Sequence, residues 1–327
     1  MRVRGDERPR PAPAHGGRRW GCAALKTRER PRPAESYYGK PIIKLPVWRE
    51  RDIAGYLFAG GLAAGSSVVA AGAELTARPH LARACKLCAS AALGASLAAL
   101  VHDLGRPARF LNMLRVFKPT SPMNMGSWLL GVYGPLNAAA AASDVLGVAP
   151  RTGRAASVGA ALSGAGIASY TAALIANTAV PAWHEGYREL PFVFAGSAAA
   201  AGAGFGLLAA PLSESEPARR IALAGAVVEL LCEGLLERRL GMVAETLHTG
   251  TAGRRMRAAR ALTAAGALGA ATLARRSRLV AALSGAALVA GSAFTRFAVF
   301  AAGVASAEDP KYTVEPQRMR MREARPA

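Results

Sequence analysis

Long runs without a charged residue are the feature that most constrains the fold of this 327-residue chain. The uncharged runs cover residues 53–73, 87–102, 119–143, 155–184, 190–213, 261–274 and 279–295. A helix needs about 20 mainly apolar residues to cross a bilayer, and backbone groups in lipid must be hydrogen-bonded within a helix or a closed barrel. None of these runs alternates with the period of two that a barrel strand requires. The sequence therefore predicts an all-α integral membrane protein.

Eight transmembrane helices are expected, seven from these runs and one from the stretch 218–239, which carries charged residues. They cover roughly residues 53–75, 82–104, 125–146, 155–179, 190–211, 218–239, 259–275 and 279–303. Alanine and glycine dominate many of them, and small residues allow helices to approach closely in a membrane. We therefore interpret Gly61-x-x-x-Gly65 and the "GAGFG" run at 202–206 as packing positions and not as ligand-binding loops.

Basic residues are segregated from the apolar runs. The chain has 41 Lys and Arg, a formal net charge of +20 and 52% hydrophobic residues. With eight spans both termini lie on one side, which then holds 30 basic residues against 10 on the other, or 16 against 10 without residues 1–51. The positive-inside rule predicts that both termini are cytoplasmic. We interpret residues 1–51 as a solvated, disordered tail, with contact to anionic lipid as the alternative, and expect no nucleic-acid partner.

Histidine and cysteine placement argues against two kinds of cofactor. A haem b would need histidines on two facing helices, whereas only His102 among the five histidines lies at a predicted helix end. Cys85-x-x-Cys88 is a single pair, and a zinc or iron–sulfur site needs further ligands at the same depth. We expect neither haem nor metal in this chain, and we interpret both cysteines as small packing residues.

Ionisable residues inside the spans are costly, so each suggests a functional site. Glu229, Glu233 and Glu237 share one face of the sixth span, and Arg296 lies within the eighth. Because both spans run towards the N-terminal side, Glu233 and Arg296 are expected at similar depth and are predicted to pair. The set is either a structural neutralisation or part of a proton or quinone path.

The stretch "VHDLGRPARF" at 101–110 brings polar groups to the end of the second span. Other spans begin or end at the same level, so that several helices contribute candidates: Asp52 and Tyr56, His102 and Asp103, and Tyr170 and Trp183. Such groups are able to hydrogen-bond the two oxygens of a quinone and exchange protons with them. The alternative is that they only satisfy the polar ends of helices.

Several segments together resemble the NrfD-like family of membrane subunits of polysulfide reductase-type molybdenum enzymes. They are "YLFAGGLAAG", "DLGRPARFLNML" followed by "PTSPMNMGSW", "SYTAALIANTAVPAW" and "TRFAVFAAGVASAEDPKYTVEPQR". The resemblance covers about residues 35–318. It implies two four-helix bundles without haem, here residues 52–180 and 181–303 followed by a tail at 304–327, with menaquinone chemistry in the first. It also implies a bacterial plasma membrane location, a four-cluster iron–sulfur partner and a molybdopterin catalytic subunit.

The resemblance also assigns roles to individual residues. Tyr170, in a Tyr-Thr-Ala context where the family has Tyr-Thr-Gly, matches its quinone-site tyrosine. Asp103 matches an acidic position, and Asp52 and Trp48 are the candidates for a polar group of the first span. Four basic residues of the following loop are expected to dock the iron–sulfur partner: Arg106, Arg109, Arg115 and Lys118. The predicted function is quinone-linked electron transfer, with an ion-translocating subunit or a purely structural anchor as alternatives.

Overall fold

The computed structural model describes residues 42–104, 112 and 114–323, and all regular elements among them are helices. Each predicted span overlaps one long helix: α1 (Glu50–Leu75), α2 (Pro79–Asp103), α4 (Pro122–Leu146), α5 (Pro150–Ala176), α7 (Leu190–Ala209), α8 (Glu216–Leu240), α10 (Gly250–Ala271) and α11 (Arg278–Glu308). Five of them, α1, α2, α5, α7 and α11, are long and apolar enough to cross a membrane. An all-α membrane protein therefore agrees with the structure, whereas eight crossings and a division into two bundles stay predictions.

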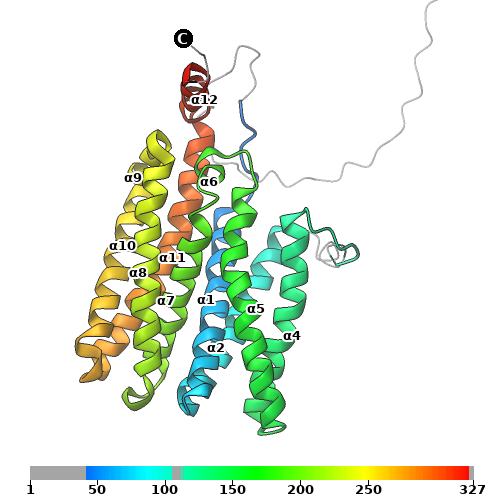
Figure 1. Cartoon of the computed structure of the whole chain (residues 1–327), viewed down its shortest axis with the longest axis vertical. Coiled ribbons are helices and arrows are strands. Elements are labelled where there is room, and N and C mark those ends of the chain that lie inside the picture. The colour runs from blue at the N-terminus through cyan, green and yellow to red at the C-terminus, as the bar shows by residue number, and fades with distance from the viewer. Residues whose placement is uncertain (1–41, 105–111, 113, 324–327) are drawn as a thin grey trace, which may run out of the picture. The chain divides into compact units, whose positions relative to one another are not determined.

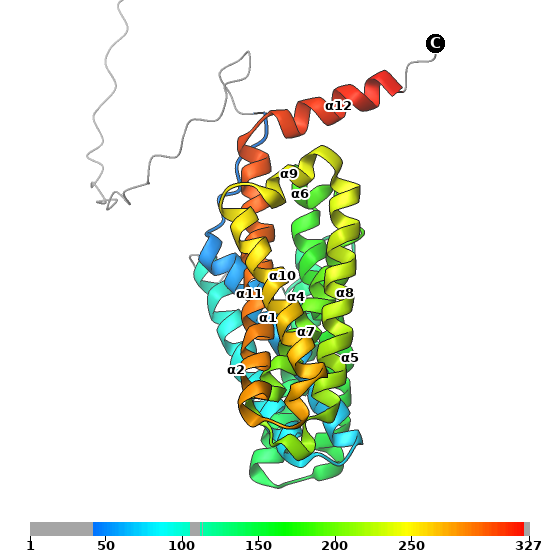
Figure 2. The same ribbon diagram turned by 90° about the vertical axis from the view of Figure 1, so that its left-hand side faces the viewer.

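Short helical elements connect or follow the long helices. They are α6 (Pro181–His184), η1 (Leu212–Glu214), η2 (Gly241–Ala244), α9 (Glu245–His248), η3 (Leu273–Arg275) and α12 (Lys311–Glu323). Helix α12 lies within the segment expected to be a tail and runs across the end of the long helices (Figure 2). Asp309 starts it, since its Oδ1 accepts a hydrogen bond from the backbone N–H of Lys311 at 3.0 Å.

Local sequence signals explain where many long helices begin and end. Proline occupies the first turn of α2, α4, α5, α7 and α8, where its missing N–H leaves no helix bond unmade. Ser121 and Ser277 cap α4 and α11 by accepting bonds from backbone N–H groups. Gly147 ends α4 in the left-handed conformation that favours glycine.

Helices α1 and α7 lie side by side at the centre of the compact unit that includes residues 33–327 (Figure 1). A β-carbon on Gly65 would lie 1.9 Å from the backbone oxygen of Ala198, and one on Gly202 would lie 2.2 Å from the carbonyl carbon of Gly65. The interpretation of these glycines as packing positions is confirmed. Helix α1 also packs on α2 and α5, and α7 packs on α8 and α11, so the central pair joins both groups of neighbours.

Candidate functional site

A cavity of about 120 Å³ opens where α1 and α4 begin and α2 and α5 end. Most of its lining is apolar, and its polar side chains come from four helices: Tyr56, Asp103, Ser127 and Tyr170. The complete lining is Trp48, Ile53, Tyr56, Leu100, Asp103, Leu104, Met123, Gly126, Ser127, Leu130, Tyr170 and Leu174. The cavity thus unites Tyr56, Asp103 and Tyr170, which are far apart in the sequence.

The polar groups of the cavity are held by different means. Tyr56 is buried at 4% exposure, two turns into α1. Asp103 closes α2, and its Oδ1 accepts a hydrogen bond from the backbone N–H of Arg49 at 3.4 Å, just before α1 begins. This bond ties the carboxylate of Asp103, which lines the cavity, to the start of the neighbouring helix.

Gly126 determines where Tyr170 can lie. A β-carbon on Gly126 would lie 2.0 Å from Cζ and 2.1 Å from the hydroxyl oxygen of Tyr170, so any larger residue would displace the phenol. The hydroxyl points at the backbone of Gly126 in the first turns of α4. The role of Gly126 in positioning Tyr170 was not predicted from the sequence. The available signal was the glycine in "PMNMGSW", which entered the predictions only as part of a family motif.

His102 and Asp52 lie beside the cavity and do not line it. Nδ1 of His102 is 2.9 Å from Oδ2 of Asp52, so the two residues pair across α1 and α2. The histidine side chain is 64% exposed, whereas that of Asp52 is 16% exposed. His102 is therefore the exposed member of the pair, at the level where α1 begins and α2 ends.

Trp183 belongs to a neighbouring cavity of about 270 Å³, which it shares with Trp48 and residues 43–47 and 178–180. Its ring stacks on Trp48 with centroids 5.9 Å apart. The indole is fully buried, donates a hydrogen bond to the backbone oxygen of Val299 at 2.8 Å and fits against Gly303. Trp48 therefore separates the two cavities, and Trp183 has the contacts of a packing residue.

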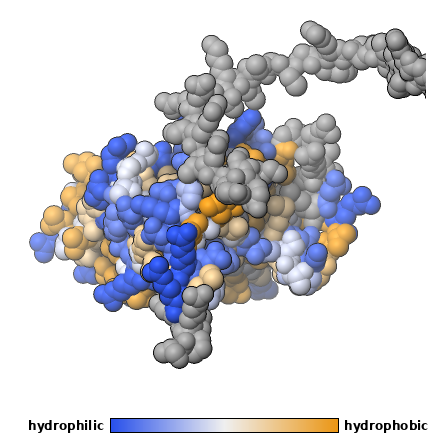
Figure 3. Space-filling view, turned by 90° about the horizontal axis from the view of Figure 1, so that it is seen from above, coloured by the Kyte–Doolittle hydropathy of each residue, from blue (hydrophilic) through white to orange (hydrophobic). Residues whose placement is uncertain are grey.

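The expected docking loop is described in part. Arg106 and Arg109 lie outside the described residues, whereas Arg115 and Lys118 are exposed just before α4. The loop is held to α4 because the side chains of Asn124 and Trp128 both donate hydrogen bonds to the backbone oxygen of Val116. Seen from the end that carries α12, hydrophilic residues cover much of the face that is not grey (Figure 3).

The predicted ion pair between Glu233 and Arg296 is wrong. Glu233 Oε2 instead accepts from Nε of Arg260 on α10 at 3.0 Å, and Arg260 also binds Glu237. Arg296 lies against the Phe194 ring, with its guanidinium carbon 3.8 Å from the ring centroid. Depth along a helix can be estimated from sequence, but the rotation that turns Arg296 towards α7 depends on packing.

A charged cluster that was not predicted from the sequence lies at the opposite end of the first helices. Nζ of Lys86 on α2 is 2.5 Å from Glu74 on α1 and 3.3 Å from Asp144 on α4. Lys86 is only 4% exposed. Its signal is a lysine between apolar residues within the predicted second span, residues 82–104, where a charged side chain is costly.

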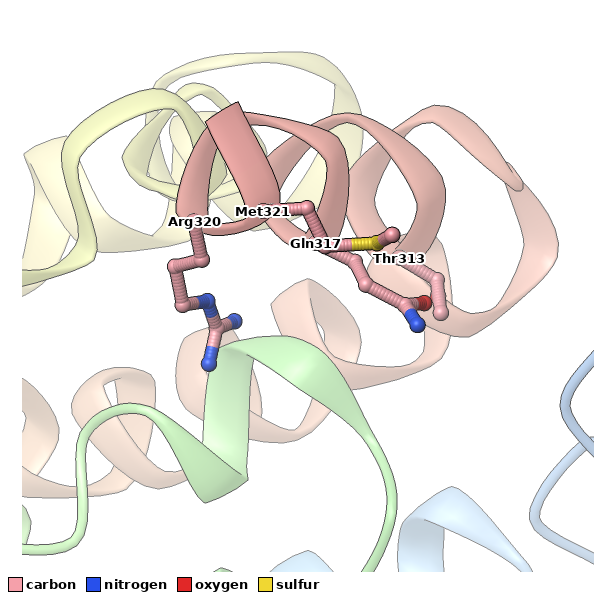
Figure 4. Close-up of a pocket in the computed structure, with 4 residues that line it drawn as sticks. All are labelled: Thr313, Gln317, Arg320 and Met321. Atoms are coloured by element: carbon pink, nitrogen blue, oxygen red, sulfur yellow. The ribbon is translucent and has the colours of Figure 1, made fainter. Parts of the chain in front are cut away.

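A hollow of about 420 Å³ lies at α12, lined by Thr313, Gln317, Arg320 and Met321 (Figure 4). Arg320 points from it towards the α6 region, where Nη2 is 2.9 Å from Glu185. Its residues are mostly exposed, so it has the character of a surface groove under an end helix. Within the described part of the chain, no three His, Cys, Asp or Glu side chains are placed to hold a metal ion.

Comparison with known proteins bears on the helices from α1 to the start of α8. The family model described as "Polysulphide reductase, NrfD" matches residues 45–222, which include every residue lining the Tyr170 cavity. No curated protein matches the chain. The matched region is more than half of the sequence. The chain therefore belongs to the NrfD family of polysulphide reductase proteins, membrane subunits of redox complexes.

Proposed function

We propose that this chain holds a quinone, most simply menaquinone, in the cavity of Tyr56, Asp103 and Tyr170 and passes electrons between it and an iron–sulfur partner subunit. One observation carries the proposal: two phenols and a carboxylate from three helices converge, together with Ser127, on a mostly apolar cavity where α1 and α4 begin and α2 and α5 end. Membership of the family supports the same function.

The residues present fit a quinone ring. The ring is flat and apolar with two carbonyl oxygens, and binding sites of this kind combine an apolar lining with a few convergent polar groups. Leu100, Leu130 and Leu174 supply apolar walls, and Trp48 supplies an aromatic one. The hydroxyl of Tyr170 would donate a hydrogen bond to one quinone oxygen, and Asp103 would stand at the other.

Proton exchange follows from the positions of the charged groups. When bound, a quinone supplies two-electron redox chemistry that takes up or releases protons at its oxygens. Asp103 is positioned to hold one such proton, and its bond to the Arg49 N–H keeps the carboxylate oriented. The exposed His102, paired with Asp52 beside the mouth, would return protons to the water at that side.

Partner binding is proposed for the same end of the molecule. Exposed Arg115 and Lys118 precede α4, whose first turns line the cavity, so an acidic partner surface bound there would lie close to the quinone. Arg106 and Arg109 extend the same loop in the sequence. This arrangement suits an iron–sulfur subunit with a molybdopterin subunit beyond it, on the cytoplasmic side of a bacterial plasma membrane.

The test is the quinone content of the purified chain. Tyr170→Phe and Asp103→Asn together are expected to lower bound menaquinone by at least about tenfold, since each removes a polar contact worth about 1 kcal/mol or more. Tyr133→Phe is the matched control: this tyrosine is buried in the same helices, 2.9 Å from Ser67, and does not line the cavity. Equal quinone content in the unaltered chain, the double variant and Tyr133→Phe would contradict the proposal and favour a structural anchor.

A further inference from the structure

A second group of buried polar residues lies between α7, α8, α10 and α11. Glu229 and Arg296 are 1% and 0% exposed. The hydroxyl of Thr295 donates a hydrogen bond to Glu229 Oε1 at 2.8 Å, and Ser197 and Thr263 face the same carboxylate. We call these five residues the Glu229 cluster. Glu229, Thr263, Thr295 and Arg296 lie beyond the region that the family model matches.

Several atoms of the Glu229 cluster have no hydrogen-bond partner among the described residues. They are Oε2 of Glu229, Oγ1 of Thr263, and Nε and Nη1 of Arg296. A buried polar group without a partner destabilises a fold, and does so more strongly when it is charged. In native proteins groups of this kind are normally satisfied by ordered water. These atoms belong to Glu229 itself and to two side chains that interact with its carboxylate, Thr263 and Arg296.

A series of charged groups leads from this region to the surface. Glu233 lies one turn beyond Glu229 on α8 and binds Arg260, which also binds Glu237. Glu237 is 3.3 Å from Nε2 of His248, whose side chain is 52% exposed at the end of α9. Titratable side chains therefore follow one another from solvent to the buried carboxylate.

The other direction is closed by helix packing. Ser197 donates a hydrogen bond to Ser292 at 2.9 Å, and beyond it α7 and α11 meet backbone to backbone. A β-carbon on Gly204 would lie 2.7 Å from the oxygen of Gly285, and one on Gly285 would lie 2.3 Å from the oxygen of Gly204. Such contact leaves no room for a file of water molecules between these helices.

We propose that Glu229 is a buried proton-binding site, hydrated by water held between Arg296 and Thr263, which exchanges protons with the α9 side only, through Glu233 and Glu237. A proton that enters from water at His248 or Glu237 passes to Glu233 and then neutralises the Glu229 carboxylate. Arg296 keeps its charge, so the net charge of the Glu229 cluster rises by one. The charged groups around this site are Arg296 from α11, Glu233 from α8 and, through Glu233, Arg260 from α10.

Infrared difference spectroscopy of the full chain, purified without quinone, tests the proposal independently of the Tyr170 cavity. Acidification is expected to produce a carbonyl stretch of a buried carboxylic acid, which shifts in heavy water. Glu229→Gln should remove this band, and Glu229→Asp should retain it at a different frequency even if Glu229→Gln folds poorly. Asp144→Asn, at the other end of the helix array, is the matched control and should leave the band unchanged.

The path is tested by the rate at which the band responds to heavy water. Glu233→Gln should slow that exchange by about 100-fold, the lower end of the effect of a positioned proton-transfer group. In oriented proteoliposomes, heavy water on the α9 side alone should shift the band. A band that is absent at every pH, persists in Glu229→Gln, exchanges equally fast in Glu233→Gln or responds from the opposite side overturns the proposal.

Discussion

Lys86 and Arg296 are both almost completely buried, at 4% and 0% exposure, yet their surroundings differ. Lys86 lies near the ends of α1, α2 and α4 and contacts two carboxylates, those of Glu74 and Asp144. Arg296 lies mid-helix, has no ion pair among the described residues, and contacts the ring and the backbone oxygen of Phe194. One cation is compensated by direct contact, and the other by a ring, a carbonyl and the proposed water.

This difference distinguishes charges that hold helices together from a charge that can change when a carboxylate gains or loses a proton. A buried cation that touches its counter-ions holds helices together, and removing it leaves the carboxylates uncompensated. A buried cation held off its nearest carboxylate leaves room for that carboxylate to change protonation. Lys86, Glu74 and Asp144, which we call the Lys86 group, therefore form a fixed connection among three helices. The Glu229 cluster instead has the features of a site whose charge can change.

The largest effect is expected from Lys86→Met. It removes the buried cation between Glu74 and Asp144, whose side chains are 16% and 25% exposed, and leaves only the exposed Arg83 nearby, 3.7 Å from Asp144. This loss should lower the free energy of unfolding by about 3 kcal/mol, the lower end of the range for a broken buried pair. Denaturant unfolding in detergent measures the loss. Adding Glu74→Gln and Asp144→Asn to the same chain should recover most of it. If the triple variant is no more stable than the single one, Lys86 does not stabilise the fold by compensating Glu74 and Asp144.

A smaller effect is expected from Gly126→Ala, which probes the other end of the same helices. The added β-carbon would lie 2.0 Å from the Tyr170 ring, so the phenol must move, at a cost of about 1–3 kcal/mol. Quinone content should fall together with stability. Gly131→Ala on the same helix is the control, because its nearest neighbour would be 3.9 Å away. Normal quinone content in Gly126→Ala would mean that the position of Tyr170 is unimportant.

Arg296→Gln should cost less than Lys86→Met, about 1–2 kcal/mol, although Arg296 is the more buried of the two. A glutamine can still donate to the backbone oxygen of Phe194, and Glu229 can accept a proton when the cation is lost. Unfolding of both variants under one set of conditions measures the difference. Equal losses would show that Arg296 is a structural counter-ion and would remove the contrast between the two sites.

Different parts of this molecule could be predicted to different degrees. The uncharged runs located seven of the eight long helices in the described part of the chain, because apolar length is a local property of the sequence, whereas α8 carries charged residues along its length. Tyr56, Asp103 and Tyr170 could be placed at one level of the membrane because the direction of each helix fixes which end of it lies there. The partner of Glu233 did not, since the choice between Arg260 and Arg296 depends on how each helix is rotated. Lys86 was missed because its counter-ions come from two other helices, brought together only by packing.

The smallest effect is expected when acid weakens an exposed ion pair, the contact between Lys311 and Glu245. Nζ of Lys311 at the start of α12 is 3.0 Å from Oε2 of Glu245 on α9, and also faces Asp309. The hydrogen bond and the charge of Lys311 hold the pKa of Glu245 below its usual range. A lowered carboxyl pKa stabilises the folded contact above the ordinary pKa of about 4, and this contribution is lost as the pH falls through the lowered value.

Protease cleavage between α11 and α12 should therefore increase modestly below about pH 4. In Glu245→Gln, cleavage should already be raised at neutral pH and respond less to acid. An acid response equal to that of the unaltered chain would mean that Glu245 does not hold α12. Both residues are solvent-exposed, so this change should be far smaller than that of Lys86→Met, as expected for a screened surface pair against a buried one.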